Sequence, residues 1–256
     1  MTAPAHRGSR RRRLGEAIAV LPARLVGAVL GVLTGALRRL RSPRPIHRTG
    51  IVLEGRIEST GPAHPEVEPS GIAWIDATAP GRVEARLSRG IGVPVPVPDV
   101  WGLAFRQALD TARLGVPASG DVLLATVAGS GGLGRFVPAV RLSPWGASFG
   151  SVMPYRSTRG PVLVSARTVS GAPASATTVG QARELGRTPW ILQLLWATPR
   201  GPWRVFATLT LSAADGAAVD RADLRFDPLS SPPTGAGTFA WTRALRKRSY
   251  RAARRD

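Results

Sequence analysis

The stretch WRVFATLTL, residues 203–211, indicates the fold class. Its apolar positions Trp203, Val205, Ala207, Leu209 and Leu211 alternate with Arg204, Phe206, Thr208 and Thr210. This two-residue period is typical of a strand with one face against a core. Six further runs of strand length are IVLEGRIE (51–58), RVEARLS (82–88), DVLLATVA (121–128), RFVPAVRL (135–142), PVLVSARTV (161–169) and WILQLLWA (190–197).

Turns rich in glycine and proline join these runs, and most are not separated by long helical segments. This arrangement favours an antiparallel sheet closed into a barrel over βαβ units. We therefore predict an α+β protein that is mainly β. Residues 181–186 and 238–255 are expected to be helical. SGGLG, residues 130–134, lacks the G-K-[ST] ending of a phosphate loop and is expected to be a hairpin turn.

Three regions are expected: a disordered basic arm over 1–13, an apolar or amphipathic helix over 14–41, and a barrel domain over 42–256. Pro22 should kink or restart the helix. Its uninterrupted apolar run, residues 25–37, is shorter than the roughly 20 residues that cross a bilayer. No small-x-small cleavage site follows it. Two interpretations stay open: the helix packs on the domain, or it contacts an anionic membrane surface as a peripheral element. The expected location is cytoplasmic, either free or on the inner face of the membrane.

The net charge of +19 is concentrated at the two ends of the chain. Residues 1–48 carry +10 and residues 243–256 carry +6, which leaves only +3 for the middle. Lys247 is the only lysine, so base composition explains the arginine excess better than selection for phosphate contacts, and no specific nucleic-acid partner is expected. The chain has no cysteine and three histidines, which argues against thiolate-bound or histidine-rich metal centres.

Two rare residues are candidates for chemistry. His47 lies in RPIHRTGIVLEGRIE, residues 44–58, and Tyr250 is one of only two tyrosines. Arg246 precedes Tyr250 by four residues, so both share one face of the expected helix. A guanidinium beside a phenol favours the phenolate. A phenolate is a hard oxygen ligand suited to ferric iron.

With these motifs the sequence resembles the catalase superfamily over most of the domain. Its distal Arg-x-x-His-x-x-Gly pattern, with a Gly and a Glu further along the strand, matches Arg44, His47, Gly50, Gly55 and Glu58. ARLSRGIGVPVPVPDVWGLAFR is similar to the family's next motif, with Arg86, Ser88, Asp99, Gly102 and Ala104 in register. VFATLTLSAADGAAVDRADLRFDPLSSPPTG resembles the approach to the haem-ligand helix, and Arg246-x-x-x-Tyr250 matches the proximal motif.

The resemblance implies a catalase-type barrel that binds haem b, with a C-terminal helix that carries the proximal tyrosine. By resemblance, Tyr250 is the iron ligand and Arg246 keeps it anionic. His47 is the distal acid–base residue, and Ser88 orients its imidazole. The haem propionates pair with Arg44, Arg86 and Arg254, a role that Arg255 could also fill.

One position departs from the family. The distal amide of catalases falls on Ala125 or Thr126, and Thr126 offers a hydroxyl but no amide donor. The chain is also shorter than typical catalases. We therefore expect weakened catalase activity, with peroxidase-type activity or conversion of an organic or lipid hydroperoxide. The first alternative is a non-catalytic haem or lipid-binding protein on the same barrel. The second is a basic membrane- or nucleic-acid-associated scaffold without a cofactor. The sequence does not specify the oligomeric state.

Overall fold

The computed structural model describes residues 50–61, 68–92, 96–108, 120–175, 177–214, 224 and 226–242. The chain divides into two units. The larger unit, residues 46–239, contains every strand of the described part. Of the other unit, residues 1–45 with 240–256, the structure describes only 240–242, which are helical. The expected arm over 1–13, the expected helix over 14–41 and most of the helix expected over 238–255 lie outside the described residues.

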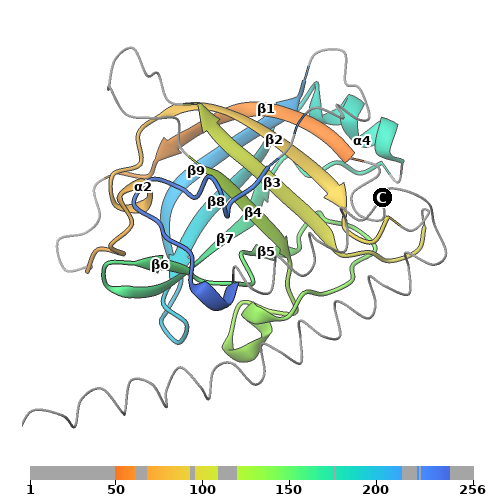
Figure 1. Cartoon of the computed structure of the whole chain (residues 1–256). Helices are drawn as coiled ribbons and strands as arrows, with labels where there is room; N and C mark the ends of the chain where they lie inside the picture. Colours follow the sequence, from red (N-terminus) through yellow and green to blue (C-terminus); the bar gives the residue numbers. More distant parts are fainter. Residues whose placement is uncertain are drawn as a thin grey trace, which may run out of the picture. The chain divides into compact units, whose positions relative to one another are not determined.

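Nine antiparallel strands form one sheet in the order β5-β4-β3-β2-β1-β9-β8-β7-β6 (Figure 1). The strands are β1 (Gly50–Ser59), β2 (Gly81–Arg89), β3 (Trp101–Ala108), β4 (Asp121–Thr126), β5 (Ser148–Gly150), β6 (Tyr155–Ser157), β7 (Gly160–Ser170), β8 (Trp190–Ala197) and β9 (Arg204–Ala213). A further pairing, Phe149 of β5 with Ala166 of β7, closes eight of these strands into a barrel. Strand β6 pairs with the other end of β7. The predicted mainly β, closed antiparallel architecture is therefore confirmed.

The barrel interior is filled by alternate residues of each strand, as the two-residue period requires. Ile51, Leu53 and Ile57 of β1 are buried in the core, whereas Glu54 and Glu58 between and beside them are exposed. Gly55 occupies a core-facing position in the same strand. A Cβ atom on Gly55 would lie 1.8 Å from the backbone oxygen of Thr210 in β9, so only glycine allows this close approach of the two strands.

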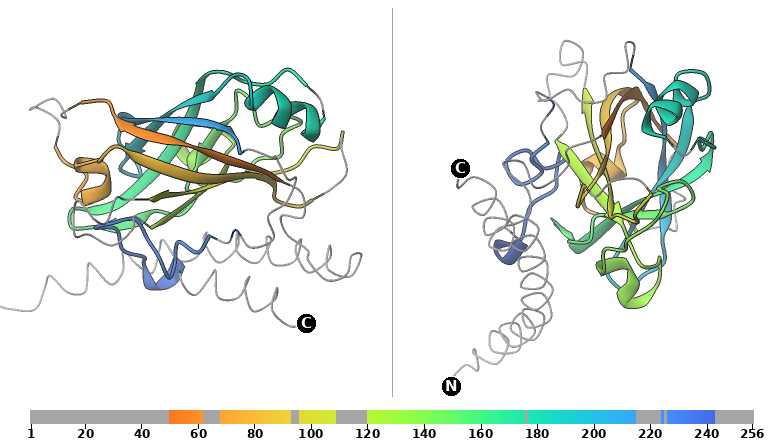
Figure 2. Two further views of the ribbon diagram at one scale, coloured as in Figure 1. Left: turned by 90° about the horizontal axis from the view of Figure 1, so that it is seen from above. Right: turned by 90° about the vertical axis from the view of Figure 1, so that its right-hand side faces the viewer.

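Two short helices lie at opposite ends of the barrel (Figures 1 and 2). Helix α2 (Ala73–Asp76) buries Trp74, whose ring packs edge-on against Phe206 at 5.2 Å between centroids. Helix α4 (Thr178–Leu185) overlaps the helix expected over 181–186, and its Leu185 is fully buried. The helices therefore extend the apolar core beyond the open ends of the strands.

One predicted strand is wrong. Residues 135–142 contain the end of a 3₁₀ helix, Gly132–Phe136, followed by isolated bridges of Pro138 to Val127 and of Arg141 to Asp99. The predicted hairpin turn at 130–134 overlaps the start of this 3₁₀ helix, and the chain does reverse direction there, since Ala128 N–H donates to the Val137 carbonyl at 2.9 Å. Among the described residues, no helix combines the length and apolar character needed to traverse a bilayer.

Candidate functional site

The outward face of β1–β4 brings together two of the predicted site residues. Residues directly opposite each other in antiparallel strands share a face. Leu87 and Leu103 point into the core, so Ser88 and its partner Gly102 point outward. Arg86 precedes Ser88 by two residues and therefore lies on the same outward face.

Small residues occupy one row across this face. Gly50 pairs with Ser88, Ser88 with Gly102, and Gly102 with Ala125. We call these four residues the outward row. No side chain in it is larger than serine, so the outward face of these four strands has no bulky group along this row.

Arg86 and Ser88 both lie beside Gly50. A Cβ atom built on Gly50 would come within 2.9 Å of Arg86 Nε and 3.3 Å of Ser88 Cβ. The missing side chain thus makes room for the Arg86 guanidinium. Arg86 is half-buried and Ser88 is only 6% exposed. A fixed cation beside a row without bulky groups suits a planar ligand that carries carboxylates, and haem is such a ligand.

The other predicted site residues are His47, Arg44, Arg246, Tyr250 and Arg254. All five lie outside the described residues, so their roles as distal base, propionate partners and iron ligand stay predictions. Among the residues that the structure describes, no group of three or more His, Cys, Asp or Glu side chains could hold a metal ion. The described part of the candidate site therefore consists of the outward row and Arg86.

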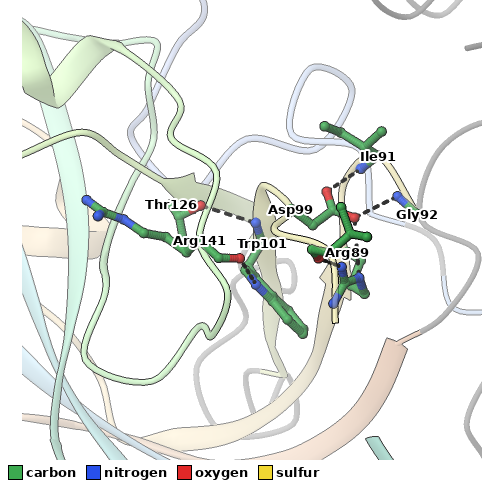
Figure 3. Close-up of polar contacts among 8 residues, drawn as sticks. Arg89, Ile91, Gly92, Asp99, Trp101, Thr126 and Arg141 are labelled. Carbon is green, nitrogen blue, oxygen red and sulfur yellow. Dashed lines mark hydrogen bonds and ion pairs between the residues drawn. The ribbon is translucent and has the colours of Figure 1, made fainter. Parts of the chain in front are cut away.

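Thr126 faces the opposite side of the sheet from Ser88. Its neighbours in that alternation, Leu124 and Val122, are core residues, and its side chain is fully buried. The hydroxyl accepts a hydrogen bond from Trp101 N at 3.1 Å (Figure 3). It donates to the Ala139 carbonyl at 2.6 Å. Of the two candidates for the distal amide position, Ala125 belongs to the outward row and Thr126 does not.

Solved structures share this architecture. A fungal catalase superposes with a TM-score of 0.52 and 15% sequence identity, over 86% of this chain and 61% of the catalase. Catalase A from Saccharomyces cerevisiae gives a TM-score of 0.51 and 13% identity, over 86% of this chain and 62% of the catalase. The chain has a catalase-like fold. No family model and no curated protein sequence matches the chain. The chain spans less than two thirds of the length of these catalases, and at such low identity the likeness concerns the fold alone.

A buried ion pair stabilises the loop that joins β2 to β3 in this catalase-like fold. Asp99, matched by resemblance, is fully buried, and Arg89 Nε lies 3.3 Å from its carboxylate (Figure 3). The same carboxylate accepts hydrogen bonds from Ile91 N at 2.8 Å and Gly92 N at 2.9 Å. The Arg89 guanidinium also lies 5.0 Å from the centroid of the Trp101 ring. The carboxylate of Asp99 thus joins an arginine and two backbone N–H groups of one segment, which supports a role of Asp99 in loop stability.

A strap over residues 226–237 runs along the outside of the catalase-like barrel (Figure 2). Asp121 of β4 accepts a hydrogen bond from Asp227 N, and Asp121 N donates to the Ser231 carbonyl at 2.6 Å. Further along, Gly237 and Arg156 exchange two backbone hydrogen bonds. By resemblance, this run leads to the haem-ligand helix. The strap is therefore fastened at both ends before the chain reaches that segment.

Arg106 also contacts both Asp121 and the strap. Its Nε lies 2.6 Å and its Nη2 3.0 Å from the two carboxylate oxygens of Asp121, a bidentate pair. Hydrogen bonding to Asp121 raises the pKa of Arg106 above its ordinary value, and burial opposes this only in part. The guanidinium also stacks 5.4 Å from the centroid of Phe226 in the strap. Asp121 thus links the sheet to the strap through both its carboxylate and its backbone.

A groove of about 590 Å³ lies at the barrel end where Trp196 and Arg204 are paired. Arg204 stacks on Trp196 at 5.5 Å, and Arg159 lies 3.7 Å from Glu68. No predicted site residue lines the groove. Both arginines already have partners within the protein, and no residue of the outward row lines the groove.

Proposed function

We propose that the chain binds haem b against the outward row and uses it to convert a hydroperoxide. The observation that carries the proposal is the arrangement around Gly50, where Arg86 Nε and Ser88 Cβ both lie close to the space that a side chain would occupy. The catalase-like fold supports it further, because the fungal and yeast structures are those of catalases. The proposal concerns this chain, and it goes beyond the likeness in fold.

Each residue has a defined part in the proposed mechanism. Haem, when bound, would supply an iron for redox chemistry with a peroxide. Arg86 would pair with a propionate, as would Arg44 and Arg254. Tyr250 would hold the iron, and Arg246 would keep the phenolate charged. His47 would take a proton from the incoming peroxide oxygen and return it to the departing one.

The sequence places His47 close to the row along the chain. It precedes Gly50 by three residues, a distance of at most about 11 Å of extended chain. Gly50 is paired with Ser88, whose hydroxyl is suited to orient an imidazole. This connectivity supports the assignment of Ser88 as the partner of His47.

The proposed substrate is an organic or lipid hydroperoxide rather than hydrogen peroxide. At the β4 position of the outward row stands Ala125, which has no hydrogen-bond donor in its side chain. A small polar substrate depends on such donors for orientation, whereas a larger apolar one gains its affinity from surface contact. The same residue favours the alternative function, a haem or lipid-binding protein without turnover.

The absorbance spectrum after addition of haemin to the purified full chain tests cofactor binding. We expect a tyrosinate-ligated ferric spectrum in the wild type and in Tyr155→Phe, which changes the only other tyrosine. Tyr250→Phe should lose this spectrum. Failure of the wild type to take up haemin would exclude both proposed functions that depend on haem, the enzyme and the non-catalytic haem-binding protein.

Hydroperoxide consumption separates the enzyme from the carrier. Haem-loaded His47→Ala should lose at least about 100-fold in rate, the usual contribution of a positioned acid–base residue. His64→Ala is the matched control and should keep the wild-type rate. Equal rates in wild type and His47→Ala, with intact haem binding, would leave only the carrier.

A further inference from the structure

Exposed apolar side chains are concentrated in one part of the described chain. Seven large apolar side chains are exposed, and four of them fall within ten residues: Leu133 (81%), Val137 (43%), Val140 (56%) and Leu142 (69%). A fifth, Val97 (49%), precedes Asp99, which pairs with Arg141. We call these five residues the apolar edge. Single exposed apolar residues are ordinary, but a contiguous group marks a contact surface.

The apolar edge is held in place by the fold. The Arg135 guanidinium is buried and donates to the carbonyls of Thr198 at 3.0 Å and Ser130 at 3.0 Å. Its charge also stacks 4.9 Å from the centroid of Trp203. Ala139 N donates to the Thr126 carbonyl at 2.8 Å. These bonds fix the 3₁₀ helix and the segment after it, which project beyond the barrel strands in two views (Figures 1 and 2).

The segment that carries four of the five edge residues lies in a stretch of the sequence without acidic residues. Between Asp121 and Glu184 the sequence has six arginines and no acidic residue. Arg141, within the edge, is exposed. The acid that pairs with it in register, Asp99, is fully buried and is neutralised by Arg89. The segment therefore offers apolar side chains and cationic charge together, without an exposed carboxylate.

We propose that the apolar edge docks on an anionic lipid bilayer. Leu133, Val137, Val140 and Leu142 enter the region below the headgroups, and Arg141 contacts lipid phosphates. Shallow insertion of a few apolar side chains beside cationic charge is sufficient for interfacial binding. A stable protein interface involves about 20 to 30 residues on each side, many more than the edge supplies. The proposal does not depend on haem or on the segment over residues 14–41.

Flotation of the full chain with vesicles tests the docking. Vesicles of phosphatidylcholine are compared with vesicles in which roughly one third of the lipid is phosphatidylglycerol. We expect binding to the anionic vesicles and a loss of about tenfold or more in the double variant Leu133→Ser/Leu142→Ser. Val169→Ser/Val205→Ser, which changes two exposed valines outside the edge, should bind like the wild type. Equal thermal unfolding of all proteins confirms that the variants are folded.

The absence of cysteine allows a second, local readout. A polarity-sensitive dye is attached to Leu142→Cys and, as the matched control, to Val169→Cys. Anionic vesicles should raise and blue-shift the emission at 142 and leave that at 169 unchanged.

Three results would each overturn the proposal. The first is a wild-type chain that does not float with anionic vesicles. The second is flotation while the dye at 142 remains in water, which would assign the binding to another segment. The third is a concentration-dependent change at 142 without vesicles, which would identify the partner of the edge as a second copy of the chain.

Discussion

Ser88 and Thr126 point to opposite faces of one sheet. Ser88 lies in the outward row with Gly102 and Ala125, whereas the Thr126 hydroxyl is buried and bonded to Trp101 N and the Ala139 carbonyl. A group on Ala125, and not one on Thr126, would therefore face the same ligand as Ser88. Two substitutions at adjacent positions follow from this geometry.

Ala125→Asn should raise the rate of hydrogen peroxide disproportionation by the haem-loaded protein. The new amide would stand in the outward row as a hydrogen-bond donor toward a bound peroxide. Orientation by one such donor contributes about 10- to 1,000-fold, so a gain of at least about tenfold per haem is expected. Oxygen release at a fixed haem content is the measurement.

Thr126→Asn is the matched control and should give no gain. It replaces a hydroxyl that bonds both Trp101 N and the Ala139 carbonyl in a fully buried position, so a loss of about 1 to 3 kcal/mol in unfolding free energy is expected. Activation by Thr126→Asn, with none by Ala125→Asn, would contradict the assignment of the row.

Arg86→Gln should weaken haem binding by roughly tenfold or more. It removes the cation beside Gly50 that we assign to a propionate, and a charge-assisted hydrogen bond contributes about 1.5 to 3 kcal/mol. Titration with haemin, followed by the Soret band, gives the affinity. Arg82→Gln, on the same face of β2 but exposed, should keep the wild-type affinity. Equal haem affinities of the two variants would exclude Arg86 as a partner of a haem propionate.

The period-two pattern of residues 203–211 predicted the strand, but it did not predict correctly for every residue whether the side chain is buried or exposed. Strand β9 follows the predicted alternation at Ala207, Leu209 and Leu211, which are fully buried. A bulge opposite Leu194 and Leu195 then shifts the register. Phe206 is buried and Val205 is exposed as a result, the reverse of the pattern. A bulge depends on the partner strand, so one strand's own sequence does not reveal it.

Local sequence also fails to predict very short strands and the burial of charged side chains. Strands β5 and β6 have three residues each, too few for a periodic signal. Arginine is usually exposed, yet Arg135 and Arg89 are buried, Arg135 against backbone carbonyls such as that of Thr198 and Arg89 beside the carboxylate of Asp99. Family resemblance matched Arg86, Ser88, Gly102 and Ala104 to motif positions, but it did not predict that β2 and β3 pair Arg86 with Ala104 and Ser88 with Gly102. The resemblance could not decide whether Ala125 or Thr126 corresponds to the distal amide of catalases, because that depends on which face of the sheet each residue occupies.

Asp99→Asn should destabilise the protein by about 3 to 5 kcal/mol, since it leaves the buried Arg89 guanidinium without a counter-charge. It also puts an amide NH₂ group near two N–H donors, those of Ile91 and Gly92. Urea unfolding is the measurement. The exposed pair Arg56–Glu58, 3.8 Å apart, provides the control, and Glu58→Gln should change stability by less than about 0.5 kcal/mol. Similar unfolding midpoints for the two variants would show that the buried pair is dispensable.

Asp121→Ala should loosen the strap while the barrel stays folded. The Asp121 carboxylate binds the guanidinium of Arg106 and accepts a hydrogen bond from Asp227 N, so its removal leaves both groups without that acceptor. We expect faster hydrogen exchange at residues 227–231 and a loss of about 1 to 3 kcal/mol in unfolding free energy.

Glu84→Gln is the matched control for this prediction. Glu84 pairs in register with Arg106 and attracts it electrostatically, but it lies on β2, whereas the strap is bonded at Asp121 on β4. Exchange at residues 227–231 should therefore be unchanged in Glu84→Gln. Slow exchange that persists in Asp121→Ala would mean that the backbone bond from Asp121 N to the Ser231 carbonyl holds the strap alone. Acceleration in both variants would instead assign the effect to the charge of Arg106. Only acceleration confined to Asp121→Ala identifies the carboxylate as the group that fastens the strap.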